Sequence, residues 1–249
     1  MKGTILQPTY LPWMGYFEMI NSTDVYVAFD HVQFVKKSWQ QRNKIKTSNG
    51  VIWLTIPTKG GKRNTRICDT KISYDHGNPL EKHWRTITLT YKKALYFNEY
   101  KSVFEEIYSK EYDHLSNLSV VIIKAICDIL GIKTKIIFSS RLNLNDENVG
   151  KTEKVINLCK KVDITHLYDT KGAKEFIDAS LFHREGIPIT FQHFEHPVYK
   201  QLWGDFVPYM SVIDLLFNEG DESLDIIRNG RRKPYISGEG IIGHNRSKK

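Results

Sequence analysis

The sequence predicts an α/β fold built on an open, mainly parallel sheet. Short apolar segments alternate along the chain with longer segments whose apolar residues recur with the period of a helix, and this alternation is typical of a parallel sheet. Segment 24–30 is apolar almost throughout, as expected for a strand that is buried on both faces. The 249 residues suit one large domain, or one domain with an insertion.

The first elements follow the order strand, loop, helix, strand. A strand is expected at 4–6, a loop between Pro8 and Pro12, and a helix at 14–20 that leads into the strand at 24–30. Two parallel strands joined by a helix of this length form a right-handed crossover. We therefore expect this unit to open the parallel sheet.

Segment 33–74 has a different pattern, because it consists of short β-like pieces. The clearest strand is 51–57, and the Ser-Asn-Gly sequence at 48–50 signals a hairpin turn before it. The segment is also rich in lysine and arginine, with five of them and no acid between residues 36 and 46. We expect a small, β-rich, basic insertion at the carboxyl edge of the sheet.

The rest of the chain returns to alternating helices and strands. In chain order, we expect two helical pieces over 79–111, a helix at 114–130, a strand at 135–138, a helix at 152–162, a strand at 166–168, a helix beginning at 173, a strand at 187–191, a helix at 210–217 and a short helix ending at Gly230. This gives a single domain at 1–230. A basic, flexible tail is expected at 231–249, where glycines recur among basic residues.

The composition narrows the class of protein. Hydrophobic residues at 41% and charged residues at 26% describe an ordinary globular chain rather than a disordered one. No apolar run approaches the ~20 residues of a membrane-spanning helix, and Gln7 and Pro8 interrupt the N-terminal apolar stretch, so no secretion signal is expected. Three scattered cysteines have no zinc-ligand spacing. We expect a cytoplasmic protein without a metal site, and no motif identifies a cofactor.

The segment at 7–16 is the first candidate site, because it follows the first strand and leads into the first helix. Ligands collect at this position in open α/β sheets, and Gln7, Tyr10 and Trp13 supply polar tips and a flat ring there. The position resembles the HxGH loop of the nucleotidylyltransferase superfamily, which implies a Rossmann-like, nucleotidylyltransferase-like sheet, although both histidines are absent. The alternative is a rigid loop whose aromatic residues only pack.

Segment 30–46 is the second candidate site, and it is dense in amides, cations and aromatic rings. A nucleotide-linked substrate needs cations for phosphate, amides for hydroxyl groups and a flat ring for stacking. The candidate residues are Asp30, Gln33, Lys36, Trp39, Arg42, Asn43 and Lys46. For Lys36, Lys37 and Lys44, a solvated hairpin surface is the stronger alternative. The net charge of +8 agrees with an anionic ligand.

Two further residues stand out near the C-terminus. His196 precedes Pro197, which restricts its backbone, and imidazole titrates near neutrality, so His196 is a candidate general base. A surface histidine in a proline turn is an equally good interpretation. Asp214 lies within an almost wholly apolar helix and must therefore be paired, which favours a structural role.

At several of these segments, the chain resembles the WbqC-like family. The sequences that carry the resemblance are QPTYLPWMGYF at 7–17, DHVQFVKKSWQQRNKIK at 30–46, WLTIP at 53–57 and MSVIDLLFNEG at 210–220. Together they extend over most of the chain. The resemblance implies a bacterial cytoplasmic protein associated with O-antigen, capsule and related polysaccharide gene clusters. A role proposed for such proteins is the transfer of glycine or another aminoacyl group to an amino sugar.

The leading hypothesis is a transferase that attaches an amino acid, such as glycine, to a nucleotide-linked amino sugar. Arg42, Lys46 and Lys36 would hold the diphosphate, and Trp39 or Trp13 would stack on the base or sugar. Asp30 or His196 would accept the proton of the attacking amine. Backbone N–H groups of the 7–16 loop would stabilise the developing oxyanion.

The donor in this hypothesis is an activated acyl or aminoacyl group of unknown type. An aminoacyl-tRNA, a thioester carrier and a coenzyme A ester all remain open, and nucleic acid is a partner only if tRNA is the donor. The alternative function is a non-catalytic nucleotide-sugar or glycan-precursor binding protein that assists a glycosyltransferase complex. RNA binding through the basic region at 33–66 is a third hypothesis, ranked last.

Overall fold

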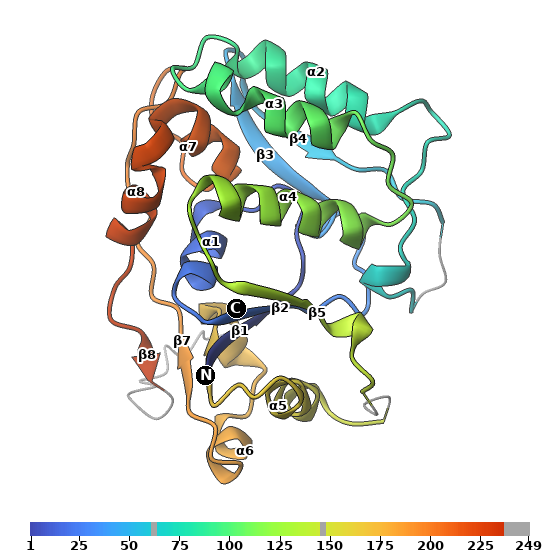
Figure 1. The fold of residues 1–249 in the computed structure, drawn as a ribbon, viewed down its shortest axis with the longest axis vertical. Helices are drawn as coiled ribbons and strands as arrows, with labels where there is room; N and C mark the ends of the chain where they lie inside the picture. Colours follow the sequence, from blue (N-terminus) through green and yellow to red (C-terminus); the bar gives the residue numbers. More distant parts are fainter. Residues whose placement is uncertain (61–63, 145–147, 237–249) are drawn as a thin grey trace, which may run out of the picture.

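A computed structural model describes residues 1–60, 64–144 and 148–236 as a mixed α/β fold around a six-stranded sheet (Figure 1). Its strands are β1 (Lys2–Leu6), β2 (Val25–Ala28), β5 (Lys135–Phe138), β6 (His166–Asp169), β7 (Ile189–Phe191) and β8 (Tyr235–Ile236). The spatial order is β5-β2-β1-β6-β7-β8. All neighbouring pairs are parallel except β7 and β8, so the predicted mainly parallel sheet is confirmed.

The order of the strands fixes the place where the sheet reverses its direction of growth. The chain builds outward from β1 through β2 to β5, and then returns to the other side of β1 with β6 and β7. Gly3 of β1 lies opposite Val25 of β2 and Leu167 of β6. The carboxyl ends of β1 and β6 therefore meet at the reversal point, which is where open α/β sheets bind ligands.

Helices cover both faces of this sheet (Figure 1). On one face, α5 (Lys151–Lys161) and α6 (Ala179–Arg184) pack against Ile5, Val27 and Leu167. On the other face, a larger core joins Leu6, Ala28 and Tyr168 to a group of six helices. These are α1 (Met14–Asn21), α2 (Pro79–Tyr91), α3 (Phe97–Tyr108), α4 (Leu115–Ile129), α7 (Val212–Glu219) and α8 (Ser223–Asn229).

The predicted hairpin exists as a separate two-stranded sheet. It consists of β3 (Arg42–Thr47) and β4 (Gly50–Thr55), paired antiparallel with Lys44 opposite Trp53. Gly50 has a φ of 103°, a conformation that favours glycine at the turn. Ile45 and Leu54 face the large core, so the hairpin packs against the helices of the α1 face. Trp39 and Gln40, just before β3, bond to Tyr10 and Gln7 after β1, which places the start of the hairpin beside the carboxyl edge.

The structure differs from the sequence-based expectations at two places. The helix expected from 173 is a 3₁₀ turn at Lys171–Glu175, and α6 begins only at Ala179, after Asp178 accepts the backbone N–H of Ser180 at 2.9 Å. The expected tail from 231 begins within the fold instead, because β8 pairs with β7. Residues 237–249 of that tail lie outside the described residues.

Across residues 1–60, 64–144 and 148–236, no helix is both long enough and apolar enough to cross a membrane.

Candidate functional site

The two segments singled out in the N-terminal part of the sequence lie against each other. The loop at 7–13 packs beneath the start of the hairpin, and the backbone N–H of Tyr10 donates to the carbonyl of Trp39 at 3.2 Å. The buried amide of Asn43 donates to the carbonyl of Leu11 at 2.5 Å. Asn43 therefore fixes the loop to β3, and its side chain faces the protein interior.

Gln7 connects the hairpin lead-in to the reversal point of the sheet. It directly follows β1 and is exposed, and its Oε1 accepts the Nε2 of Gln40 at 2.7 Å. Gln40 is itself buried, and its Oε1 accepts the backbone N–H of Val35 at 2.8 Å. The exposed face of the Gln7 amide is thus held in a fixed position at the carboxyl edge.

Beside Gln40, two exposed tryptophans and two half-buried cations form a surface that we name the tryptophan–cation platform (Trp39, Arg42, Lys44 and Trp53). The two indole rings are 49% and 44% exposed, with centroids 5.3 Å apart and a tilt of 44°. Arg42 and Lys44 are two residues apart on β3, and Lys44 lies opposite Trp53, so their side chains share one face of the hairpin. The Arg42 guanidinium lies 4.3 Å from the Trp53 ring centroid.

The platform carries positive charge that the surrounding protein does not neutralise. Lys44 Nζ lies 5.9 Å and 5.8 Å from the two indole centroids. Neither Arg42 nor Lys44 forms an ion pair with a residue that the structure describes. Arg42 Nε is buried and has no hydrogen-bond partner, which costs about 1–3 kcal/mol. A ligand with a flat ring and an attached anion would use all of these features.

Asp30, a predicted proton acceptor, occupies a cage of hydroxyl groups at the end of β2. Its carboxylate is buried, and Oδ1 accepts Ser139 Oγ at 3.1 Å and the Ser140 backbone N–H at 2.9 Å. Its Oδ2 accepts Ser116 Oγ and Ser140 Oγ, both at 2.9 Å. Four hydrogen bonds join the end of β2 to α4 and to the loop after β5. This geometry favours an anchoring role for Asp30.

His196, the second predicted proton acceptor, also has both ring nitrogens engaged. Nδ1 lies 2.8 Å from the carbonyl of Pro197, to which it donates, and Nε2 accepts the backbone N–H of Tyr209 at 3.1 Å. Burial lowers the pKa of His196. The ring stacks on Trp13, with centroids 6.2 Å apart and planes at 19°. His196 and Trp13 thus belong to a packed aromatic cluster, and Ser211, which bridges to Trp13, donates its backbone N–H to the carbonyl of Lys44 at 2.9 Å.

Tyr10 lies in the core rather than at a surface. Its hydroxyl is 2.7 Å from Tyr108 Oη and 2.8 Å from His83 Nδ1. Burial lowers the pKa of His83 to about 4. Because a neutral imidazole can supply both a donor and an acceptor nitrogen, these three residues hold the 7–13 loop against α2 and α3.

Lys46 is also internal, although it lies on the same face of β3 as Arg42 and Lys44. Its ammonium group donates to Gln201 Oε1 at 3.0 Å and to the carbonyl of Asp205. The loop that contains both partners covers this end of the hairpin, so Lys46 is buried. By contrast, Gln33 and Lys36 are exposed on the hairpin lead-in.

Asp214 is paired inside the core, as its place in an apolar helix predicts. It is buried, and its two carboxylate oxygens accept the hydroxyls of Tyr91 and Tyr199, each at 2.8 Å. Burial raises the pKa of Asp214. The pair of tyrosines joins α7 to α2 and to the loop at 199–211.

Sequence reasoning missed three residues that the structure places at or near the carboxyl edge. Trp53 was considered only as a strand residue, and Lys44 as a solvated lysine.

Asp169 is the third of these residues. It ends β6 at the reversal point, and burial raises the pKa of its carboxyl to about 6. Its Oδ1 accepts the Thr170 backbone N–H at 2.6 Å. A lone acid at a strand end was the only signal available for Asp169.

Within 1–60, 64–144 and 148–236, no group of three or more histidine, cysteine, aspartate or glutamate side chains is placed to hold a metal ion.

Fold and site together define an α/β protein with a parallel sheet and an exposed aromatic, cationic surface beside the carboxyl edge. The chain belongs to the WbqC-like protein family, whose model matches residues 7–226. It is similar to a protein of Mycobacterium tuberculosis (strain ATCC 25618 / H37Rv) described as "Uncharacterized protein Rv1507c", with 37% identity over 234 residues. That match covers 93% of this chain and 99% of the relative. No solved structure shows significant similarity to the chain.

Proposed function

We propose that the protein is a transferase that attaches glycine or a similar acyl group to a nucleotide-activated amino sugar in bacterial surface polysaccharide biosynthesis. The observation that carries the proposal is the tryptophan–cation platform. Its exposed rings lie beside two cations that form no ion pair with a described residue, next to the carboxyl edge of the sheet. Membership of the WbqC-like family also supports this proposal, because the role proposed for such proteins is aminoacyl transfer to an amino sugar. Nucleotide sugars are made in the cytoplasm, so the proposal places the protein there.

In this proposal, the platform binds the nucleotide diphosphate part of the substrate. Trp39 and Trp53 offer faces on which a base or sugar ring stacks. Arg42 grips the diphosphate with its planar guanidinium, and Lys44 adds a second cation beside it. Lys44 takes the place that the sequence suggested for Lys46, because Lys46 is bound to the 201–205 loop.

The sugar would lie toward the reversal point of the sheet. The strand order has the pattern of doubly wound, Rossmann-like folds, which bind ligands outside the carboxyl ends at this point. The fixed amide of Gln7 is suited to a sugar hydroxyl there. A nucleotidylyltransferase-like sheet without the two histidines fits a protein that keeps the nucleotide site and has different chemistry.

The proposed reaction is the substitution of an activated acyl group by the sugar amine. The amine nitrogen bonds to the carbonyl carbon, and the bond from that carbon to the oxygen or sulfur of the donor breaks with its electron pair on the leaving atom. The proton lost by the amine passes to that leaving oxygen or sulfur. We assign positioning roles to Asp30 and His196, because their hydrogen bonds hold the loops around the site.

A product assay tests this proposal. The protein is incubated with UDP- and dTDP-linked sugars that carry a free amine, together with glycine presented as glycyl-tRNA, as a carrier-protein thioester and as a coenzyme A ester. The expected result is a product heavier by one glycyl group, formed from one sugar and one donor. Trp53→Ala should abolish it, whereas Val51→Ala on the same strand should not. If no combination of sugar and donor gives a product, the transferase proposal is contradicted.

A second candidate function is a non-catalytic nucleotide-sugar binding protein that assists a glycosyltransferase complex. The observation in its favour is that Asp30 and His196 both have their polar atoms occupied by the protein itself. It would use the same platform. Binding of the nucleotide sugar, measured by calorimetry, without product in the assay above would select this function.

A further inference from the structure

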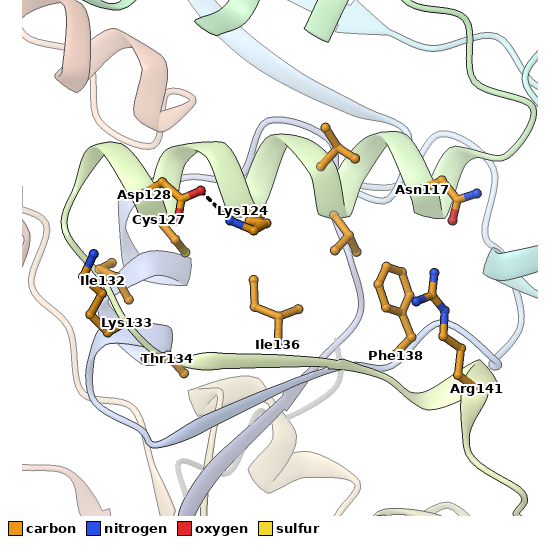
Figure 2. A pocket seen from close by; sticks show the side chains of 12 residues that line it. Asn117, Lys124, Cys127, Asp128, Ile132, Lys133, Thr134, Ile136, Phe138 and Arg141 are labelled. Carbon is orange, nitrogen blue, oxygen red and sulfur yellow. Dashed lines mark hydrogen bonds and ion pairs between the residues drawn. The ribbon is translucent and has the colours of Figure 1, made fainter.

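A groove lies between α4 and β5, on the opposite edge of the sheet from β8. Its volume is about 600 Å³, within the range of ligand-binding cavities. The floor and walls are mostly apolar: Val120 and Val121 come from α4, and Ile136 and Phe138 come from β5. Figure 2 shows Ile136 and Phe138 turned from the strand toward the helix above them.

The strand that forms one wall has an open edge. Among the described strands, β5 pairs with β2 alone, and the Lys135 backbone N–H donates to the carbonyl of Asp24 on the β2 side at 3.2 Å. Backbone groups of successive strand residues point to opposite sides, so those of Ile136 and Phe138 point away from β2. An open edge of this kind is a template for a further strand.

The two ends of the groove are positively charged. Arg141 lies at one end, with its guanidinium 4.2 Å from the Phe138 ring centroid, and Lys133 lies at the other (Figure 2). Neither forms an ion pair with a described residue. Lys124, between them, is paired with Asp128 at 2.5 Å. The groove therefore joins an apolar floor to two cations that form no ion pair within the described chain.

We propose that this groove binds an extended, acidic segment of a partner protein, which adds to β5 as a further strand. Its backbone would pair with Ile136 and Phe138, and alternate apolar side chains would fill the space under α4. Carboxylates on the segment would meet Arg141 and Lys133. A second copy of this chain fits less well, because edge-to-edge pairing would bring the lysines and arginine of two basic edges together.

The groove ends beside the hydroxyl groups that hold Asp30 at the end of β2. Asn117 lines it next to Ser116, and Arg141 lines it next to Ser140, and both serines donate to Asp30. A partner seated in the groove would therefore touch the loops that hold the carboxyl edge. This inference does not depend on the identity of the substrate, because it rests on the groove, the open strand edge and the charges alone.

Selection from a displayed library of random ten-residue peptides tests the proposal. Enriched peptides should alternate apolar residues and carry aspartate or glutamate. Arg141→Glu should weaken the binding of these peptides at least tenfold. The control is Lys101→Glu, at an exposed position of α3, which should leave binding unchanged. N-methylation of alternate backbone nitrogens of a selected peptide should abolish binding in one register and spare it in the other, as strand addition requires.

Three outcomes would overturn the proposal. The first is a library that yields no peptide sensitive to Arg141→Glu. The second is a selected peptide whose binding is indifferent to N-methylation in both registers. The third is a dimer, detected by light scattering, that becomes a monomer on Val121→Glu, which would show that a second copy occupies the groove.

Discussion

A buried carboxylate on α1 provides a sharp test of the fold. Glu18 is fully buried, and its Oε1 accepts Arg231 Nε at 2.8 Å and Ser22 Oγ at 2.7 Å. Its Oε2 accepts Gln192 Nε2 at 2.7 Å and the Tyr168 hydroxyl at 3.1 Å. Arg231 is the cation that the structure hydrogen-bonds to Glu18, and it follows α8. The perturbation is Arg231→Gln, which removes the positive charge.

The expected cost follows from the surroundings of the pair. Removing one partner of a buried ion pair costs about 3–5 kcal/mol, but the Arg231 side chain is 39% exposed and three neutral donors to Glu18 remain. We therefore expect Arg231→Gln to lower the free energy of unfolding by about 2 kcal/mol. For a chain of this size, 1 kcal/mol lowers the Tm by about 2–4 °C, so Arg231→Gln should lower it by about 4–8 °C.

The matched control is Arg228→Gln on α8. Arg228 lies 3.3 Å from Asp225, and the two side chains are 50% and 68% exposed, so the pair is worth less than about 1 kcal/mol. Calorimetry and urea denaturation at pH 7 should show a clear loss for Arg231→Gln and almost none for Arg228→Gln. Equal shifts for the two variants would refute the reasoning and the claim that the fold extends past residue 230.

Three further predictions concern buried carboxyl groups. Asp169 has its pKa raised from 3.8 to about 6 by burial, so its contribution to stability is full below pH 4 and falls as pH rises through 6. Asp169→Asn should therefore raise the free energy of unfolding at pH 8 by up to about 3 kcal/mol, and with it the Tm. At pH 4 the two proteins should have the same Tm. Asp30→Asn should lower the Tm and leave nucleotide-sugar affinity of the folded protein unchanged; an unchanged Tm with lost turnover would instead support Asp30 as the base. Tyr91→Phe removes a hydroxyl that donates to Asp214 and should cost about 1.5–3 kcal/mol in urea denaturation, so a neutral result would contradict the pairing.

Much of the fold could be predicted because its signals are local. Apolar runs marked the parallel strands, and the helical period of 115–129 marked α4. The 48–50 turn sequence marked the hairpin. In contrast, β8 is only two residues long, too short for any periodic pattern. The order of the strands and the open edge of β5 depend on pairings between distant segments, which no local pattern contains.

The candidate site was only partly predictable for the same physical reason. Residue chemistry was sufficient to select Trp39 and Arg42. Lys44 and Lys46 have the same character and lie on the same face of β3, yet only Lys46 is covered by the 201–205 loop. Strand pairing is also what places Trp53 opposite Lys44. For Asp30, the hydroxyl groups that occupy its carboxylate come from segments more than 80 residues away.

The most direct test of the tryptophan–cation platform as the nucleotide-sugar site is the affinity of Arg42→Lys for a UDP- or dTDP-linked amino sugar, measured by calorimetry. Lysine keeps the charge but lacks the planar fork that grips a diphosphate, so the proposal predicts binding at least tenfold weaker than wild type. Arg66→Lys, an exposed arginine already paired with Asp69, is the matched control and should bind as wild type does. A folded Arg42→Lys protein with undiminished affinity would contradict the proposal.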